Sequence, residues 1–120
     1  MIDHIGLFVS VAAQYADFYE KLLAPLGYVK KVAYPTAVCF ANDEDGDSVW
    51  LESPKAGNPV VPSHVAFRAK DEDAVKAFHE AGLASGGTDN GAPGPRPHYG
   101  PTYYAAYIHD PDGNNIEAML

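Results

Sequence analysis

The chain has a single cysteine, few basic residues and no long hydrophobic run, and each shortage excludes a class of protein. Cys39 alone cannot form an internal disulfide, and its AVCFA surroundings predict a buried strand in which the thiol acts as a small hydrophobic group. Eight Lys and Arg against sixteen Asp and Glu give a net charge of −8, which repels nucleic-acid backbones and anionic lipids. No segment approaches the roughly 18–20 apolar residues of a membrane-spanning helix, and no basic leader precedes an apolar core. We therefore expect no nucleic-acid or membrane partner and a cytoplasmic location.

The length and composition are those of one folded domain. The chain has 120 residues, of which 47% are hydrophobic and 20% charged, as in ordinary globular proteins. A chain of this length builds one hydrophobic core. We expect a single domain over residues 1–120.

The first half of the chain predicts a β-α-β-β-β order. The alternating segment DHIGLFVS predicts a strand, and Ser10 is placed to cap the helix that follows. That helix has apolar residues at helical spacing and ends at Gly27: Tyr15, Phe18, Tyr19, Leu22, Leu23 and Leu26. Three short strands then follow over residues 28–34, 36–42 and 48–53.

The second half begins the same order again after the Pro-rich segment SPKAGNPVVP. SHVAFRAK predicts a strand, Asp71 a helix cap, and Gly86 with Gly87 the end of the helix. Phe78 follows His64 by the same fourteen positions that separate Phe18 from His4, which indicates an internal repeat. A long Gly- and Pro-rich loop over residues 91–102 then precedes two last strands, 103–109 and 114–120, joined by the turn DPDG.

Parity along the predicted strands separates an aliphatic face from a polar one, because side chains alternate across a strand. The aliphatic face should pack on the helices. The other face holds two His and two Glu, on four different strands: His4, Glu52, His64 and Glu117. Gly6 and Ala66 lie beside the two His and leave open volume. Away from this face, His79 on a helix and His109 beside a turn are expected to be surface residues.

The two His and two Glu form a candidate metal site. A lone His at the start of a strand is more often a surface residue than a ligand. His4 and His64 occupy equivalent repeat positions, however, and both Glu lie in the last strand of their halves. Imidazole and carboxylate together suit Zn, Ni, Co, Mn or Fe(II), and an ion would offset the cost of burying two carboxylates.

Four segments resemble the vicinal oxygen chelate superfamily, which includes glyoxalase I, bleomycin- and fosfomycin-resistance proteins and extradiol dioxygenases. They are DHIGLFV, ADFYEKLLAPLGY, SHVAFRA and above all YIHDPDGNNIEAM, and the resemblance covers nearly the whole chain. It implies an α+β fold in which two βαβββ modules, about 1–54 and 62–120, form a curved eight-stranded open barrel around a metal. It also implies a homodimer, with the metal site of some members built across the interface.

Carried over to this chain, the resemblance implies the four-ligand set of glyoxalase I: His4 and Glu52 from one module, His64 and Glu117 from the other. Extradiol dioxygenases and fosfomycin-resistance enzymes resemble it with two His and one Glu. Glyoxalase I commonly carries an Arg four residues after its first His to hold glutathione, whereas Phe8 stands here. We therefore do not expect a glutathione substrate.

The walls of the expected cavity come from aromatic residues and from the long loop. Phe8 and Trp50 share the ligand face. The loop contributes further candidates for substrate binding: Arg96, His98, Tyr99, Tyr103 and Tyr104. The Arg could hold an anionic group and the aromatic rings could stack on a ligand. A loop at a dimer interface or in solvent is the alternative.

These residues leave two function classes open. The first is a metal-dependent lyase or isomerase in which the ion polarises vicinal oxygens of a small substrate and Glu52 or Glu117 acts as general base. The second is a metal-free, ligand-sequestering protein of the bleomycin-resistance kind. A dioxygenase is a further alternative.

Overall fold

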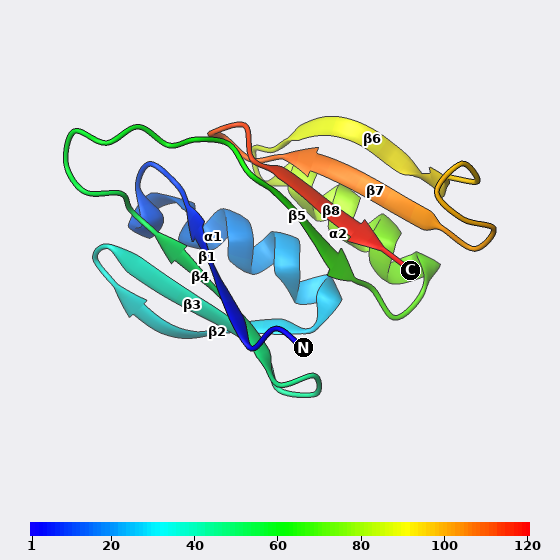
Figure 1. Ribbon diagram of the computed structural model, residues 1–120, viewed down its shortest axis with the longest axis horizontal. Helices are drawn as coiled ribbons and strands as arrows, with labels where there is room; N and C mark the ends of the chain where they lie inside the picture. Colours follow the sequence, from blue (N-terminus) through cyan, green and yellow to red (C-terminus); the bar gives the residue numbers. More distant parts are fainter.

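The computed structural model describes all 120 residues and consists of two βαβββ modules (Figure 1). The first module contains β1 (His4–Phe8), α1 (Ala12–Leu23), the short 3-10 helix η1 (Ala24–Leu26), β2 (Tyr28–Tyr34), β3 (Ala37–Asn42) and β4 (Asp47–Glu52). The second contains β5 (His64–Arg68), α2 (Glu72–Ala84), β6 (Thr88–Pro95), β7 (Tyr104–His109) and β8 (Asn115–Met119). The predicted fold class is confirmed. Neither helix is long and apolar enough to cross a bilayer.

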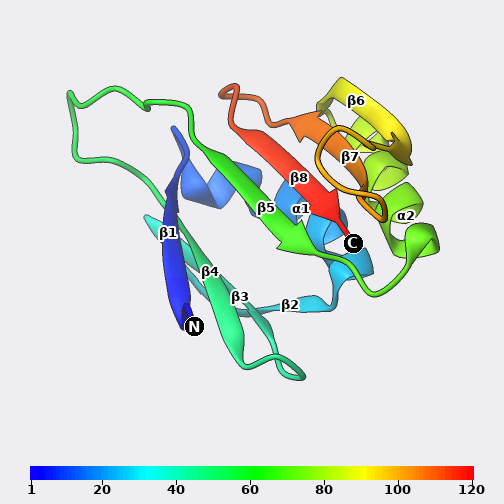
Figure 2. The same ribbon diagram turned by 45° about the vertical axis from the view of Figure 1, so that its right-hand side comes forward.

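Each module forms its own four-stranded sheet. The strand orders are β1-β4-β3-β2 and β5-β8-β7-β6, so the first and last strands of each module are neighbours. These neighbours run parallel, and the other pairs are antiparallel. β1 and β5 are therefore edge strands, while the contacts between the two modules are made chiefly by α1 and η1 with α2 (Figures 1 and 2). The sheets are not closed, as expected for a curved open barrel.

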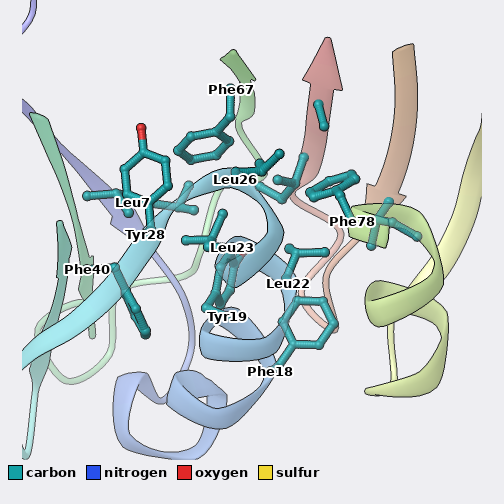
Figure 3. Packing of buried hydrophobic residues seen from close by; sticks show 14 of the residues in the cluster. Leu7, Phe18, Tyr19, Leu22, Leu23, Leu26, Tyr28, Phe40, Phe67 and Phe78 are labelled. Carbon is teal, nitrogen blue, oxygen red and sulfur yellow. The ribbon is translucent and has the colours of Figure 1, made fainter. Parts of the chain in front are cut away.

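One hydrophobic core runs through both modules. It contains 23 buried residues, and α1 packs against both α2 and the strands of its own sheet. Figure 3 shows Phe18, Tyr19 and Leu22 of α1 among side chains that come from both modules. Burying one such side chain contributes about 1.5–3 kcal/mol. The helix-covered faces of both sheets are thus the inside of the molecule, and the opposite faces are free to build a site.

Only one of the two predicted helix caps is formed. Asp71 caps α2, because its carboxylate accepts the backbone N–H of Ala74 at 2.8 Å. The expected cap of α1 by Ser10 is wrong. The N-cap residue is Val11, and its side chain makes no capping hydrogen bond. The first N–H of α1, on Ala12, is instead accepted by the hydroxyl of Ser53 at the end of β4, 2.9 Å away. The cap comes from a distant segment, which local sequence could not reveal.

The Gly- and Pro-rich segment expected to be loop is partly a strand. Residues 91–95 belong to β6, which pairs with β7 through register shifts at Asp89/Gly91 and Gly91/Gly94. Gly and Pro disfavour strands, so this strand exists because β7 offers a free edge rather than because of its own propensity. The remaining loop spans residues 96–103.

His79 was expected on the surface, and this expectation is wrong. Its exposed fraction is 9%, and its Nε2 lies 2.8 Å from Oδ1 of Asp89. The side chain therefore joins α2 to β6, the strand that sequence reasoning missed. Without β6 there was no partner to suggest that this face of the helix is covered.

The turn that precedes β8 ties the two modules together. Asp110 is buried and accepts the hydroxyl of Tyr19 on α1 at 2.5 Å. Asn114 is fully buried, donates to the carbonyl of Phe8 at 3.1 Å and accepts the N–H of Ser63 at 2.8 Å. These bonds fix the start of β8 relative to β1 and β5, and so determine where the later residues of β8 lie.

Candidate functional site

The uncovered face of the second sheet carries a row of polar residues set by strand register. Glu117 on β8 lies between Ala66 on β5 and Tyr107 on β7. Asn115, two residues earlier, lies between His64 and His109. Because paired residues share a face, His64 and Glu117 project to the same side from adjacent strands.

Glu117 is a buried carboxylate with two side-chain partners. Its exposed fraction is 2%. Oε2 lies 2.8 Å from Nε2 of His64, and Oε1 accepts the hydroxyl of Tyr103 at 2.6 Å. Burial of a carboxylate without partners would be costly, and these two contacts offset that cost. The His64 ring itself is half exposed and open to a ligand.

The Glu117 carboxylate raises the pKa values of the tyrosines around it. The hydrogen bond to Glu117, followed by burial, raises the pKa of Tyr103 well above its usual value. Burial, followed by the nearby Glu117 carboxylate, also raises the pKa of Tyr107. Both phenols stay protonated at neutral pH, and that of Tyr103 donates a hydrogen bond to Glu117.

Arg96 braces the hairpin loop as well as lining the site. Its Nη1 donates to the carbonyl of Gly94 and its Nη2 to that of Ala92, each at 2.8 Å. The guanidinium carbon lies 5.4 Å from the centre of the Tyr107 ring. The cation is thus held in place by backbone carbonyls and an aromatic ring, with its remaining N–H groups available to a ligand.

The loop also places three aromatic rings in sequence. His98 and Tyr99 have ring centres 4.1 Å apart, and those of Tyr99 and Tyr103 are 5.3 Å apart. Tyr99 is largely exposed, whereas Tyr103 reaches Glu117. The rings therefore extend from the buried carboxylate to the tip of the loop.

These residues line one cavity of about 780 Å³, a size that suits a small-molecule ligand. Six of the residues predicted from sequence meet there: His64, Arg96, His98, Tyr99, Tyr103 and Glu117. Sequence reasoning missed Asn90, Tyr107 and Asn115 as lining residues. Asn115 could have been found because it shares the strand parity of Glu117, and Tyr107 because it pairs with Glu117 between β7 and β8. Asn90 lies in β6 and had no signal.

The candidates of the first module are not part of this cavity. Phe8, Trp50 and Glu52 share the uncovered face of the first sheet with His4, whose exposed ring bonds to Asp3 at 2.7 Å. Nowhere in the chain do three His, Cys, Asp or Glu side chains lie close enough together to hold a metal ion. One chain therefore brings His64 and Glu117 into contact and leaves His4 and Glu52 apart from them.

The first and last strands pair in the same register in both sheets, but one repeat position carries different residues. Gly6 pairs with Trp50, as Ala66 pairs with Glu117, so Trp50 stands at the repeat position of Glu117. Glu52 lies two residues further along, opposite Phe8. A Cβ placed on Gly6 would lie 2.5 Å from Oε1 of Glu52, so the Glu52 carboxylate rests over this glycine. A role of Glu52 as metal ligand stays a prediction.

Comparison with known proteins identifies the family. Residues 1–118 match the family model described as the Glyoxalase/Bleomycin resistance protein/Dioxygenase superfamily. The chain belongs to this superfamily. No curated protein sequence matches it significantly.

Solved structures of this superfamily share the fold. A glyoxalase/bleomycin resistance protein from Albidiferax ferrireducens T118 superposes with a TM-score of 0.87 at 32% identity, over 99% of this chain and 98% of the other. A glyoxalase-related enzyme from Fulvimarina pelagi gives 0.74 at 20% identity, over 99% and 86%. A lactoylglutathione lyase from Agrobacterium tumefaciens gives 0.72 at 21% identity, over 99% and 92%. The latter two likenesses concern the fold alone.

One chain brings together only two of the four residues expected to bind a divalent metal. Superfamily members often use such metals. The contact between a His64 nitrogen and a Glu117 oxygen brings together two donors of the type that Zn, Ni, Co, Mn and Fe(II) accept. Two donors are too few, and the remaining candidates lie on the other sheet. A metal would therefore need donors from outside the module.

Proposed function

We propose that this glyoxalase-superfamily chain is a metal-dependent enzyme that acts on a small substrate through two neighbouring oxygen atoms, with isomerase or lyase chemistry. The observation that carries the proposal is the buried Glu117 carboxylate in contact with the half-exposed His64 ring, at the floor of a 780 Å³ cavity. His64 and Tyr103 offset the cost of burying the Glu117 carboxylate, and the exposed part of the His64 ring remains free to hold a ligand or an ion.

In this proposal two copies of the chain complete each site. His4 and Glu52 of one subunit face His64 and Glu117 of the other, because the two pairs lie on separate sheets within one chain. The unpaired edges of β1 and β5 support a twofold partner, since free strand edges are usually covered. Exposed Phe8 and Tyr34 on the uncovered face of the first sheet support it too.

The chemistry divides between the ion and the protein. His64 and Glu117, with His4 and Glu52 of a second copy, would hold a divalent ion, which would supply Lewis acidity to polarise a substrate carbonyl and acidify the neighbouring C–H group. Glu52 or Glu117 would take the proton from that carbon, and the electron pair of the broken C–H bond would move into the carbonyl system. The same carboxylate would then return the proton to the adjacent carbon. Tyr103 holds one oxygen of Glu117 and keeps the carboxylate oriented.

Arg96 favours a substrate with one anionic group. It is one of only two Arg in a chain of net charge −8, and it lines the cavity. Because backbone carbonyls already fix its guanidinium, little further entropy is lost when an anion binds. His98, Tyr99 and Tyr103 would hold the body of the ligand.

Glutathione is not part of the proposed substrate. Phe8 stands on the sheet face where a cation would be needed to hold a glycine carboxylate, and losing a charged hydrogen bond costs about 1.5–3 kcal/mol. We expect metal-loaded protein to turn over the methylglyoxal–glutathione adduct poorly. A kcat/KM above roughly 10⁶ M⁻¹s⁻¹, the range of efficient enzymes, would show that this protein is a true glyoxalase.

A second candidate function is metal-free ligand binding. Two observations favour it: the hydroxyl of Tyr103 already occupies one Glu117 oxygen, and an indole stands at the repeat position of that carboxylate. In that case the aromatic loop would sequester a ligand without chemistry. Dioxygenase chemistry is the third alternative, and it would require Fe(II) or Mn and molecular oxygen.

A subunit-mixing experiment tests the proposed function. His4→Ala and His64→Ala homodimers should each lose metal binding, because every site in them lacks one ligand. Unfolding the two variants together and refolding them forms heterodimers in which one of the two sites is intact. Elemental analysis should then recover one metal per heterodimer. Wild-type protein that stays metal-free after incubation with Zn, Ni, Co, Mn and Fe(II) would favour metal-free ligand binding instead.

A further inference from the structure

The bulged strand β6 is shaped around the side chain of Arg96. Its register with β7 shifts between Asp89 and Gly91 and again between Gly91 and Gly94. A Cβ on Gly91 would lie 3.2 Å from Nη2 of Arg96, and a Cβ on Gly94 would lie 3.3 Å from Nη1. Both distances are shorter than ordinary van der Waals contact, so the two glycines leave the space that the guanidinium occupies. The glycines that weaken this strand therefore serve the position of one side chain.

The same strand holds Arg96 by its backbone and gives it no anionic partner. The carbonyls of Ala92 and Gly94 each accept one of its N–H groups at 2.8 Å, and its Nε donates to no atom of the chain. No carboxylate lies within salt-bridge distance of the guanidinium, although the chain has sixteen Asp and Glu and two lysines do form such pairs. A half-buried cation with donors left over and no counter-ion is a receptor for an anion.

The charges in the cavity favour a monoanion. Arg96 is the one Lys or Arg among the lining residues, and Glu117 is the one Asp or Glu. A carboxylate group would be neutralised by the guanidinium, and it matches the planar fork of the guanidinium with two parallel hydrogen bonds. A phosphate dianion would leave one negative charge uncompensated in the cavity that the Glu117 carboxylate lines, and like charges repel each other.

Aromatic rings next to Arg96 favour a flat ligand. The guanidinium carbon lies 5.4 Å from the centre of the Tyr107 ring. The Tyr99 ring has its centre 4.1 Å from that of His98 and 5.3 Å from that of Tyr103, and this tyrosine is 64% exposed. An aromatic ring placed on Tyr99 would remove apolar surface from water and gain a stacking contact. The cavity thus pairs one cation with an open aromatic surface.

We infer that this cavity binds an aromatic carboxylate, whose carboxylate group pairs with Arg96 and whose ring lies on Tyr99, and that Gly94 is a positioning residue for that pairing. The inference names the substrate class of the proposed function and rests on it for the use of this cavity as the substrate site. The carboxylate is the anionic group, and the two neighbouring oxygen atoms are further substituents of the same molecule.

Ligand-observed NMR on the full chain tests the ligand class with four probes. Benzoate is compared with benzamide, which is flat but neutral, with cyclohexanecarboxylate, which is charged but not flat, and with phenyl phosphate, which is a dianion. We expect benzoate to bind about tenfold more tightly than each of the others, because it alone combines a single charge with a flat ring. EDTA in the buffer keeps bound metal from contributing.

Variants of the chain test the assigned residues through the ratio of the benzamide and benzoate dissociation constants. Arg96→Gln should reduce this ratio to about one and leave benzamide binding within about twofold of wild type, because only the charged contact is lost. Lys76→Gln, which removes the same charge from an exposed position on α2, should keep the ratio. Arg96→Lys, which keeps the charge and loses the fork, should lower the ratio by about threefold.

Gly94→Val tests the positioning role. Its side chain would meet Nη1 of Arg96 and displace the guanidinium, so the ratio should fall to about one, whereas valine itself favours a strand. Urea denaturation shows whether this variant folds. If it does not, Gly94→Ala takes its place, with a smaller fall in the ratio expected because one methyl group moves the guanidinium less. A loss of stability alone would not change the preference between two probes of the same shape.

The outcomes separate this inference from the proposed function. Wild-type protein that binds benzamide, cyclohexanecarboxylate or phenyl phosphate as tightly as benzoate would overturn the ligand class, and a ratio that survives Arg96→Gln would overturn the assigned cation. A wild-type ratio in the folded Gly94 variant would overturn the positioning role. Each of these results leaves metal-dependent chemistry standing. A preference for benzoate that depends on Arg96, in a protein that binds none of Zn, Ni, Co, Mn and Fe(II), would support the inference and overturn the metal-dependent enzyme.

Discussion

At the scale of single residues, buried polar side chains hold the site in position. Asp110, Asn114 and Glu117 are all at most 3% exposed, and each has side-chain or backbone partners. Asp112, in the same turn, is less buried and accepts the N–H of Ser10 at 2.6 Å. Three residues of the DPDGN segment thus bond to the first module, and they do so immediately before the strand that carries Glu117.

Replacing Asn114 with Ala should lower the free energy of unfolding by about 3 kcal/mol, because buried partners would lose their hydrogen bonds. The partners are the carbonyl of Phe8, the N–H of Ser63 and the carboxylate of Asp110. Urea denaturation measures the change. Asn58→Ala is the control, because this exposed side chain makes no hydrogen bond, and it should cost less than about 0.5 kcal/mol. Similar losses in both variants would contradict the assigned role.

The contact between His79 and Asp89 predicts a pH effect on stability. The hydrogen bond from His79, followed by that from the N–H of Gly91, lowers the pKa of Asp89 below its usual value of 3.8. A lowered folded pKa means that the stabilisation is complete above about pH 4 and is lost as the pH falls through the folded value. The stability difference between wild type and Asp89→Asn should therefore shrink below about pH 4. Urea denaturation between pH 3 and pH 7 checks this, and a constant difference would refute it.

At the scale of secondary structure elements, the closeness of α1, α2 and β7 depends on a glycine. A Cβ on Gly82 of α2 would lie 2.7 Å from Cγ1 of Ile108 on β7 and 3.0 Å from Cδ1 of Leu22 on α1. Gly is unfavourable inside a helix, so its presence here has a packing reason. The absence of a side chain lets the two helices and the second sheet share one core.

Gly82→Ala should lower stability by about 1–2 kcal/mol, because overpacking outweighs the gain in helix propensity. Thermal and urea unfolding measure the net effect. Ala77→Gly is the matched control, since Ala77 is exposed on the same helix and reports propensity alone. If Gly82→Ala instead stabilises the protein by the amount that Ala77→Gly destabilises it, the contact is not tight.

At the scale of the whole molecule, the separation of the two candidate pairs predicts an oligomer. His4 and Glu52 lie on one sheet and His64 and Glu117 on the other, with no group of three potential ligands in one chain. A groove of about 790 Å³ lies between the edge strands, lined by Ile5, Val65 and Phe67 among others. A groove whose lining is mostly hydrophobic, flanked by unpaired strand edges, suits a second copy of the chain.

Light scattering at micromolar concentration should therefore give twice the 12.9 kDa mass of one chain. Burial of apolar surface and of strand edges would drive the association. Phe8→Asp, on the exposed sheet face, should shift the equilibrium towards monomer, whereas Leu83→Asp, on an exposed part of α2, should not. A monomeric wild-type protein would remove the basis for a shared site.

The sequence by itself determined the periodic elements, the repeat and the direction in which side chains point. Alternation placed His64 and Glu117 on one face, and the structure brings these two into contact, because facing depends only on local geometry. The loop residues Arg96, His98, Tyr99 and Tyr103 line the same cavity because β6 and β7 pair into a hairpin, and local sequence did not reveal that pairing.

The tertiary structure alone decided which strands pair in which register and how the two modules pack. It made a strand of the Gly- and Pro-rich segment, buried His79 against that strand, and placed Trp50 instead of Glu52 at the repeat position of Glu117. It also placed His4 and Glu52 on one sheet and His64 and Glu117 on the other. Register and packing depend on contacts between residues far apart in the chain, and local periodicity carries no information about them.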